Sequence, residues 1–293
     1  MRVATFRVDG RRRVGELAPD GETVRPFGVE SEAGALPLIE AMAAGQRPVT
    51  NGTTFRLAQV ALEAPIPRPR RNIFCVGKNY HEHAHEFARS GFDSSAGAGA
   101  VPDAPIIFSK VPETVTGPGQ PIRIDPAVSP AIDYEAELAV VIGKGGRRIR
   151  KAAALDHVWG YTIVNDVTAR DLQGRHKQWL LGKSQDSFCP MGPWIVTRDE
   201  IDLADTPVRC WVNGDLRQAA NTRDLIFDVP TLIETISAGL TLLPGDIIAT
   251  GTPAGVGIGF KPPKYLKAGD VVRIEIGGIG VLENPVAAVD AAA

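Results

Sequence analysis

The sequence predicts an α+β protein, a mixed β-roll in which strands dominate. Segments with the alternation typical of strands outnumber segments with helical periodicity, and the two kinds do not alternate regularly along the chain. The 31 glycines and 23 prolines indicate many turns and loops. These observations argue against a doubly wound sheet, in which a helix follows each strand.

The N-terminal part is expected to be separate: residues 1–66 are predicted to form a small α/β domain and residues 67–293 a larger second domain. Its expected elements are two strands, Val3–Val8 and Thr23–Phe27, and two short helical pieces, Pro37–Ala44 and Phe55–Ala61. The proline-rich segment Ala64–Arg71 cannot continue a helix, so we expect an extended connector there.

The second domain is predicted to contain most of the strands. They are Asn72–Val76, Pro105–Phe108, Ile122–Ile124, Tyr134–Ile142, Tyr161–Val164, Trp194–Val196, Val208–Val212, Asp246–Thr250 and Val271–Ile276. Helical patterns are fewer: a short helix over the sequence NYHEHAHEF, then Lys151–His157, Thr168–Trp179 and Pro230–Ala238. Thr168 and Asp171 have the spacing of a capping box at the start of the third of these helices.

Charge and hydropathy exclude several classes of protein. The 293 residues include 32 basic and 34 acidic side chains, which argues against a general nucleic-acid or anionic-membrane binder. No apolar run reaches the roughly 18 residues of a membrane span, and the N-terminus lacks the apolar stretch of a signal peptide. Three widely spaced cysteines, Cys75, Cys189 and Cys210, favour reduced thiols and a cytoplasmic protein.

The segment DYEAELAVVIG places several acids on one face of a predicted strand. Side chains alternate along a strand, so Asp133, Glu135 and Glu137 share a face. Buried without partners, these carboxylates would repel each other, and a hard divalent cation would remove that cost. A charged, solvated edge strand is the alternative, and spacing alone leaves both open. Asp166, where a later strand gives way to a helix, is either a further ligand or an ordinary turn aspartate.

The segment NYHEHAHEF contains two candidate arrangements of histidine. His81, Glu82 and His85 match the H-E-x-x-H pattern of zinc peptidases, although the helix is short and no third ligand follows. His83 and Glu86 are three residues apart, so on a helix the carboxylate can orient the imidazole as a general base. The alternative for each histidine is exposed helix polarity.

Two later segments complete the candidate chemistry. Lys183 stands among apolar neighbours, and if it is buried it needs an anionic partner. The glycine-rich stretch Pro244–Gly259 follows a strand and either exposes backbone N–H groups to an anion or forms a hairpin. The Gly/Ala/Ser-rich segment 90–103 is expected to be a lid that closes over a bound ligand.

Five motifs in this order resemble the fumarylacetoacetate hydrolase family: VGKNYHEHAHE, YEAELAVVIG, NDVTARDLQ, LGKSQDSFCPMGP and TGTPAGVG. The resemblance runs from about Asn72 to Pro285. It implies a compact β-roll catalytic domain, a small N-terminal domain and a homodimer.

The resemblance also implies roles for individual residues. The metal ligands would be Glu135, Glu137 and Asp166, holding Mg²⁺ or Mn²⁺, with Ca²⁺ as a substitute in crystals. Asp133 would lie behind these ligands or at the surface. Five further residues would act on the substrate: His83 and Glu86 as a water-activating pair, Lys183 and Thr252 on substrate oxygens, and Gln173 in the pocket wall. Lys78 stands where some members have arginine, and would grip the far end of the substrate.

The implied activity is metal-dependent hydrolysis of a C–C bond in an acylpyruvate or other diketo acid, giving pyruvate and a carboxylic acid. The alternatives at the same site are decarboxylation or tautomerisation of oxaloacetate and isomerisation of a 2-hydroxy-dienedioate. A catalytically silent binding protein is the rival from another class, and the presence of the acids, the pair and the lysine argues against it. Partners other than the small keto acid and a second copy of the chain are not expected.

Overall fold

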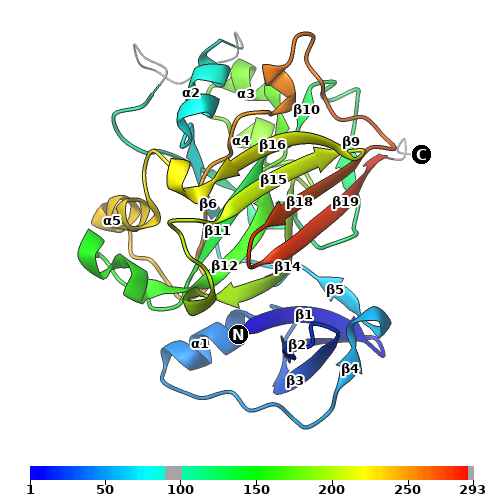
Figure 1. Ribbon diagram of the computed structural model, residues 1–293, viewed down its shortest axis with the longest axis vertical. Helices are drawn as coiled ribbons and strands as arrows, with labels where there is room; N and C mark the ends of the chain where they lie inside the picture. The colour runs from blue at the N-terminus through cyan, green and yellow to red at the C-terminus, as the bar shows by residue number, and fades with distance from the viewer. Residues whose placement is uncertain (90–100, 290–293) are drawn as a thin grey trace.

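The computed structural model describes residues 1–89 and 101–289, which fold into two main β-sheets with few helices (Figure 1). Within these residues the larger sheet has 12 strands and the smaller has five, and a two-stranded ladder lies apart from both. The order of strands does not follow a βαβ alternation. The predicted α+β class is therefore confirmed.

The strands of the larger sheet come from the N-terminal region and the middle of the described chain, and the last of them comes from further on. They are β1 (Arg2–Val8), β2 (Arg11–Leu17), β3 (Thr23–Glu30), β4 (Phe55–Arg56), β5 (Ala61–Glu63), β6 (Ile73–Gly77), β7 (Ile106–Lys110), β8 (Val115–Thr116), β11 (Ala136–Ile142), β12 (Val158–Asn165), β14 (Cys189–Thr197) and β17 (Ile247–Ala249). The smaller sheet contains β9 (Ile122–Ile124), β15 (Pro207–Val212), β16 (Asp215–Asn221), β18 (Val271–Ile276) and β19 (Gly280–Ala288). The ladder pairs β10 (Ile132–Asp133) with β13 (Thr168–Ala169).

The N-terminal strands form an antiparallel meander beside α1 (Leu36–Ala43), which matches the helix predicted there. The helix predicted over Phe55–Ala61 is wrong: β4, a 3₁₀ turn over Leu57–Gln59 and β5 occupy this region. The reason is packing, because Phe55, Leu57 and neighbouring apolar residues lie against Phe6 in a small core of their own. In an extended backbone these side chains can pack against the strands of the meander.

The meander is joined to the rest of the larger sheet through one short ladder. Strand β1 pairs antiparallel with β14, with Arg2 opposite Val196 and Val3 opposite Ile195. Figure 1 shows the N-terminal strands at one end of the molecule, next to β14. The division into domains at residue 66 stays a prediction.

Strands β11 and β12 lie at the centre of the larger sheet and position the site. Every residue of both strands is buried. They pair antiparallel with each other, and β11 pairs on its other side with β17, which runs parallel to β6. Strands apolar on both faces are typical of the middle of a covered sheet.

The smaller sheet packs over the larger one across the main hydrophobic core, to which Leu138, Val140 and Ile163 contribute from the larger sheet and Val208, Ile274 and Leu282 from the smaller. Strands β16 and β19 were missed by the sequence prediction. Strand β16 has the sequence DLRQAAN, which is polar and partly exposed, and β19 contains Pro285. Neither shows the alternation on which the prediction relied.

The helices are short. Helix α2 (His81–Ala88) and α5 (Val229–Gly239) agree with prediction, and Lys151–His157 is a 3₁₀ helix. One helix was predicted over Thr168–Trp179, but the chain forms β13, α3 (Arg170–His176) and α4 (Leu180–Lys183), because Lys177 takes a positive φ of 59° and ends α3. The predicted capping box is also absent from α3, where Asp171 instead accepts a hydrogen bond from Ser129.

Among the residues described, no helix has both the length and the hydrophobicity needed to cross a bilayer. Cys75, Cys189 and Cys210 are buried and free, as expected of reduced thiols.

Candidate metal centre and substrate pocket

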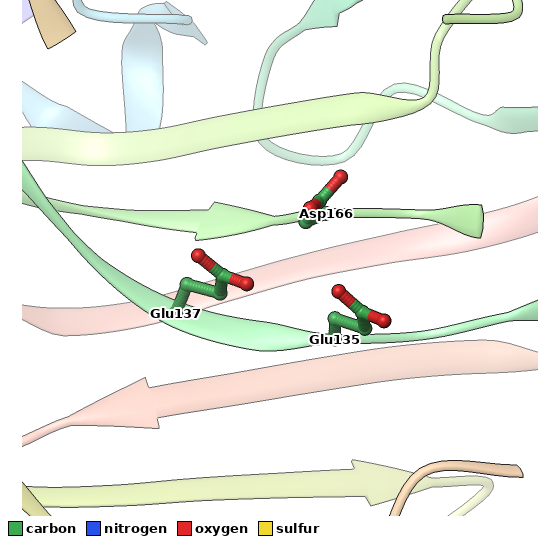
Figure 2. Close-up of side chains that lie close together, drawn as sticks. All are labelled: Glu135, Glu137 and Asp166. Atoms are coloured by element: carbon green, nitrogen blue, oxygen red, sulfur yellow. The ribbon is translucent and has the colours of Figure 1, made fainter. Parts of the chain in front are cut away.

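Three carboxylates meet where β11 begins and β12 ends. Glu137 lies on β11 and Glu135 just before it, so the two side chains share a face. Because β11 and β12 are antiparallel, Asp166 comes directly alongside, and its backbone N–H donates to the carbonyl of Glu135 (2.9 Å). One oxygen from each of the three carboxylates lies within 4.8 Å of the others, and all three residues are buried (Figure 2). The solvated edge strand is therefore excluded.

The two glutamates are held in opposite electrostatic situations. Burial would raise the pKa of Glu135, but the positive charges of Lys183 and Arg170 outweigh it and lower that pKa to about 2. Burial raises the pKa of Glu137 well above its usual range, and the negative charges of Asp166 and Glu135 raise it further. A cation among the three oxygens would favour the ionised form of Glu137.

Lys183, at the end of α4, has the anionic partners that a buried lysine requires. Its Nζ lies 2.7 Å from Oε2 of Glu135 and 2.8 Å from Oδ2 of Asp166. Burial would lower the pKa of Lys183, but these two carboxylates outweigh it, so the amine stays charged. Gly182 lets α4 approach α3, because a Cβ there would lie 2.6 Å from the backbone nitrogen of Gln173.

A second buried lysine, Lys110 at the end of β7, was missed by the sequence analysis. Its Nζ donates to Oδ1 of Asp166 (2.7 Å), to the carbonyl of Val167 (3.0 Å) and to the carbonyl of Lys183. Asp166 thus has one oxygen on each lysine. The only sequence signal is a lysine that closes an apolar strand, and such lysines are usually exposed.

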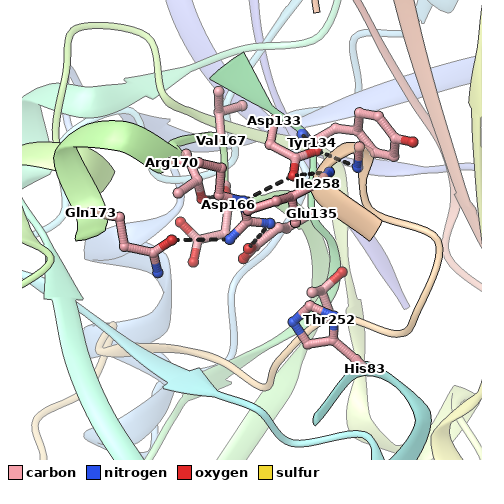
Figure 3. A network of polar contacts seen from close by, with 12 residues as sticks. His83, Asp133, Tyr134, Glu135, Asp166, Val167, Arg170, Gln173, Thr252 and Ile258 are labelled. Carbon is pink, nitrogen blue, oxygen red and sulfur yellow. Dashed lines mark hydrogen bonds and ion pairs between the residues drawn. The ribbon is translucent and has the colours of Figure 1, made fainter. Parts of the chain in front are cut away.

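Asp133 lies behind the ligand cluster, fully buried, and the surface alternative for it is excluded. Arg170 contacts it through Nε (2.8 Å) and contacts Glu135 through a second guanidinium nitrogen (2.7 Å). Gln173 accepts a hydrogen bond from the same guanidinium (3.1 Å). Figure 3 shows this chain of contacts from Gln173 through Arg170 to Asp133. Arg170 was also missed by the sequence analysis, which assigned its neighbours but not the arginine.

The histidine pair predicted on α2 is present. Nδ1 of His83 lies 3.2 Å from Oε2 of Glu86, and His83 is buried while Glu86 is half-buried. His81 and His85 are exposed on the same helix. In the described part of the chain, the group of side chains placed to hold a metal consists of the three carboxylates alone, which argues against the zinc-peptidase alternative.

The backbone N–H groups of the glycine-rich loop that follows β17 donate hydrogen bonds to carboxylates of the protein itself. The backbone N–H of Gly251 donates to Glu137 (2.8 Å), and that of Gly255 donates to Glu86 (3.1 Å). Gly257 (2.6 Å) and Ile258 (3.0 Å) both donate to Asp133. The loop therefore ties together the metal-side strand, the histidine helix and the acid behind the ligands.

These elements line a small cavity. Seven of the nine predicted site residues line it: Lys78, His83, Glu135, Glu137, Gln173, Lys183 and Thr252. The other two residues contact the lining from outside it: Glu86 contacts His83, and Asp166 contacts Lys183. Most of the predicted lid, residues 90–100, lies outside the described residues.

The donor set fits a hard divalent cation. Three buried carboxylates with oxygens this close repel one another, and all-oxygen ligands are those that Mg²⁺, Mn²⁺ and Ca²⁺ prefer. A catalytic ion of this kind keeps open positions for substrate, and the carboxylates Glu135 and Glu137 border the cavity.

Residues 72–287 match the family model described as fumarylacetoacetate (FAA) hydrolase C-terminal. The fold and the carboxylate site thus occur within a single family match, and the chain belongs to the fumarylacetoacetate hydrolase family.

Among curated relatives, the chain is 52% identical over 233 residues to oxaloacetate tautomerase YisK of Bacillus subtilis (strain 168). The match covers 79% of this chain and 75% of that protein.

Solved structures of the family carry several activity names. A fumarylacetoacetate hydrolase from Exiguobacterium antarcticum is 43% identical with a TM-score of 0.83. A 2-hydroxyhepta-2,4-diene-1,7-dioate isomerase from Mycobacterium marinum is 38% identical with a TM-score of 0.79. A maleylpyruvate hydrolase from Sphingobium sp. SYK-6, in complex with manganese(II) and pyruvate, is 33% identical with a TM-score of 0.77. Each comparison covers 99% of this chain and 100% of the other.

Proposed function

We propose that this protein is a metal-dependent oxaloacetate tautomerase, which interconverts the keto and enol forms of a small 2-keto acid. The observation that carries the proposal is the 52% identity to an oxaloacetate tautomerase, combined with a buried site that contains both a candidate metal cluster and a histidine pair. This reverses the order that the sequence analysis favoured, in which C–C hydrolysis came first and tautomerisation second.

Glu135, Glu137 and Asp166 would hold the ion, with Mg²⁺ or Mn²⁺ as the natural choice and Ca²⁺ a substitute in crystals. When bound, the ion supplies Lewis-acid stabilisation of the negative charge on the keto oxygen of the substrate. The lining of the cavity supports a small carboxylate as substrate, because Lys183, Lys78 and Thr252 all border it.

His83 is the proton carrier in this proposal. Glu86 occupies Nδ1 of the imidazole, so Nε2 is the atom left to remove a proton from the carbon next to the keto group. The ammonium of Lys183 places a positive charge beside the oxygen that becomes an enolate. The imidazolium then passes its proton to water, water passes a proton to the enolate oxygen, and the neutral enol group leaves with the product. Return to the keto form runs through the same atoms in reverse.

Hydrolysis of an acylpyruvate is the second candidate function. It is favoured by the His83–Glu86 contact, since an imidazole oriented by a carboxylate also deprotonates a water. The reaction would break a C–C bond and release pyruvate and a carboxylic acid. Decarboxylation of oxaloacetate, which releases pyruvate and CO₂, and isomerisation of a 2-hydroxy-dienedioate also belong to this chemistry.

The experiment that separates these functions measures three rates with purified protein: ketonisation of enol-oxaloacetate, pyruvate release from oxaloacetate, and pyruvate release from acetylpyruvate. We expect fast ketonisation, with much slower pyruvate release from either compound. His83→Ala should slow ketonisation by about 100-fold or more, the usual contribution of a general base. Brisk cleavage of acetylpyruvate with ketonisation at the uncatalysed rate would restore the hydrolase.

The homodimer and the cytoplasmic location stay predictions. Sedimentation of the purified protein with Mg²⁺ tests the first, with a particle of twice the 31.2 kDa chain mass as the expected result.

A further inference from the structure

Thr252 follows the end of β17 in the glycine-rich loop, and its hydroxyl group has a defined partner within the protein. Its Oγ lies 2.8 Å from Nε2 of Gln218, a residue of β16 that the sequence analysis did not single out. Thr252 also lines the cavity together with His83, and Figure 3 shows both side chains there. One side of the hydroxyl is thus held by protein, and the other borders the space for substrate.

The orientation of the Gln218 amide follows from its two backbone contacts. Its Oε1 accepts from the N–H of Ala136 (3.0 Å), and its Nε2 donates to the carbonyl of Pro253 (2.7 Å). A backbone N–H can only donate and a carbonyl can only accept, so a flipped amide would face like with like at both contacts. Nε2 therefore points one hydrogen at Pro253 and the other at Thr252.

This orientation determines what the Thr252 hydroxyl can do. A hydroxyl has one hydrogen to donate, and here its oxygen already accepts from Gln218. The hydrogen cannot point at Gln218, whose nitrogen has no lone pair to offer, and is left for an acceptor in the cavity. Oxygens of a keto-acid anion are such acceptors.

We infer that Gln218 is a positioning residue, which directs the hydroxyl hydrogen of Thr252 towards an oxygen of the bound keto acid. The inference rests on the proposed function for the identity of that oxygen. Gln218 also fixes where the donor stands, because Ala136 lies between Glu135 and Glu137 in the chain. The loop that presents Thr252 is thereby held to the strand that presents the carboxylates. Gln218 is fully buried, so water does not compete for these contacts.

The test is a double-mutant cycle between the two side chains. Gln218→Met keeps the length of the side chain but removes the donor, and it is combined with Thr252→Val, which removes the hydroxyl, and Thr252→Ser, which keeps it. The readouts are the Kd of pyruvate, measured by calorimetry with Mn²⁺ present, and kcat and KM for enol-oxaloacetate. We expect Gln218→Met to weaken pyruvate binding about tenfold with Thr or Ser at position 252, as for loss of a hydrogen bond to a charged group. With Val at position 252 the same change should cost less than twofold.

Asn284→Leu is the matched control. Asn284 is also a buried amide that donates to two backbone carbonyls, those of Gly117 (2.8 Å) and Gln120 (2.9 Å), away from the cavity. It should lower the thermal midpoint and leave the Kd of pyruvate within twofold. If Gln218→Met does not fold, Gln218→Glu replaces it, since its carboxylate keeps the contact with Ala136 and accepts the Thr252 proton. If neither folds, Thr252→Val and Thr252→Ser decide alone, and equal pyruvate affinity in the two contradicts the inference.

Equal losses from Gln218→Met in all three backgrounds would show a general structural role and overturn the inference. That result together with normal ketonisation by the wild-type protein would leave the proposed function intact. Coupling between the two side chains in pyruvate binding, without any ketonisation, would support the inference and overturn the proposed function. A wild-type protein that neither binds pyruvate nor acts on oxaloacetate would overturn both.

Discussion

The two halves of the site are built in different ways. The carboxylates Glu135, Glu137 and Asp166 stand on or beside two central strands, where the alternation of side chains and the antiparallel register bring them together. The opposite wall is the loop Gly251–Gly259, which has little regular structure and is held by its backbone N–H groups on Glu86, Asp133 and Glu137. The geometry of the strand half is set by the side chains that the two strands carry. The geometry of the loop half is set by the backbone conformation that its glycines allow.

This difference separates what the sequence could predict from what it could not. The spacing of Glu135 and Glu137 predicts a shared face directly, and the three-residue spacing of His83 and Glu86 predicts their contact. The loop offered no such rule, so its role was left open between binding an anion and forming a hairpin. Its partners are backbone amides, which every residue except proline carries, and spacing therefore does not distinguish them.

Lys110, Arg170 and Gln218 escaped prediction for a related reason. Each acts through residues more than 35 positions away or through a strand that the pattern did not reveal, as with Gln218 on β16. In the fold, the strands and short helices bring these distant segments together. The general class of fold was accessible from the frequency of strand-like segments, whereas β16 and β19 were hidden by polar residues and a proline.

Loss of a carboxylate on the strand side should have the largest effect. Glu135→Ala removes one candidate metal ligand and leaves Lys183 and Arg170 with less negative charge to balance them. We expect Mn²⁺ affinity, measured by calorimetry, to fall by more than about 100-fold and ketonisation to fall to background. The control is Glu234→Ala on α5, an exposed acid away from the cavity, which should change neither. Full activity of Glu135→Ala would show that the carboxylates are not the site.

Lys110→Met tests whether the strand half needs its supporting lysine. It leaves Asp166 buried with one cationic partner in place of two, and breaking a buried pair costs about 3–5 kcal/mol of folding stability. Metal affinity should fall about 10- to 100-fold, as for loss of a group that orients a ligand. Denaturant unfolding and Mn²⁺ titration measure the two effects. Lys144→Met, at an exposed position, is the control, and equal stability of the two variants would contradict the assigned role of Lys110.

Gly255→Ala tests the loop half. Gly255 has φ +100°, and a Cβ there would lie 1.9 Å from the carbonyl oxygen of Arg217, so the loop must move and its contact with Glu86 is lost. We expect stability to fall by about 1–3 kcal/mol and ketonisation to slow about tenfold, with Mn²⁺ affinity nearly unchanged. Gly10→Ala is the matched control, since Gly10 has φ +74° but open space around it. A large loss of Mn²⁺ affinity in Gly255→Ala would mean that the two halves are not separable.

The smallest effect is expected from pH, acting on the strand scaffold. Burial raises the pKa of Cys189 on β14 to about 12, and it raises that of Cys75 on β6 as well. A raised pKa means that folding favours the thiol, so this contribution is complete below the ordinary thiol pKa near 8.5 and is lost as pH rises above it. At pH 9 we therefore expect slightly lower stability than at pH 7, with the thiols inert to iodoacetamide until urea unfolds the chain. Rapid labelling of the folded protein would show that the strands open.

Metal dependence is tested by the initial rate of enol-oxaloacetate ketonisation, followed by ultraviolet absorbance while Mg²⁺ is titrated into metal-free protein. We expect the rate to rise to saturation with Mg²⁺, to return to the uncatalysed rate when EDTA is added, and to show no such rise in the Glu135→Ala variant. A rate that is independent of Mg²⁺, or one that stays at the uncatalysed level at saturating Mg²⁺, would contradict the proposed function.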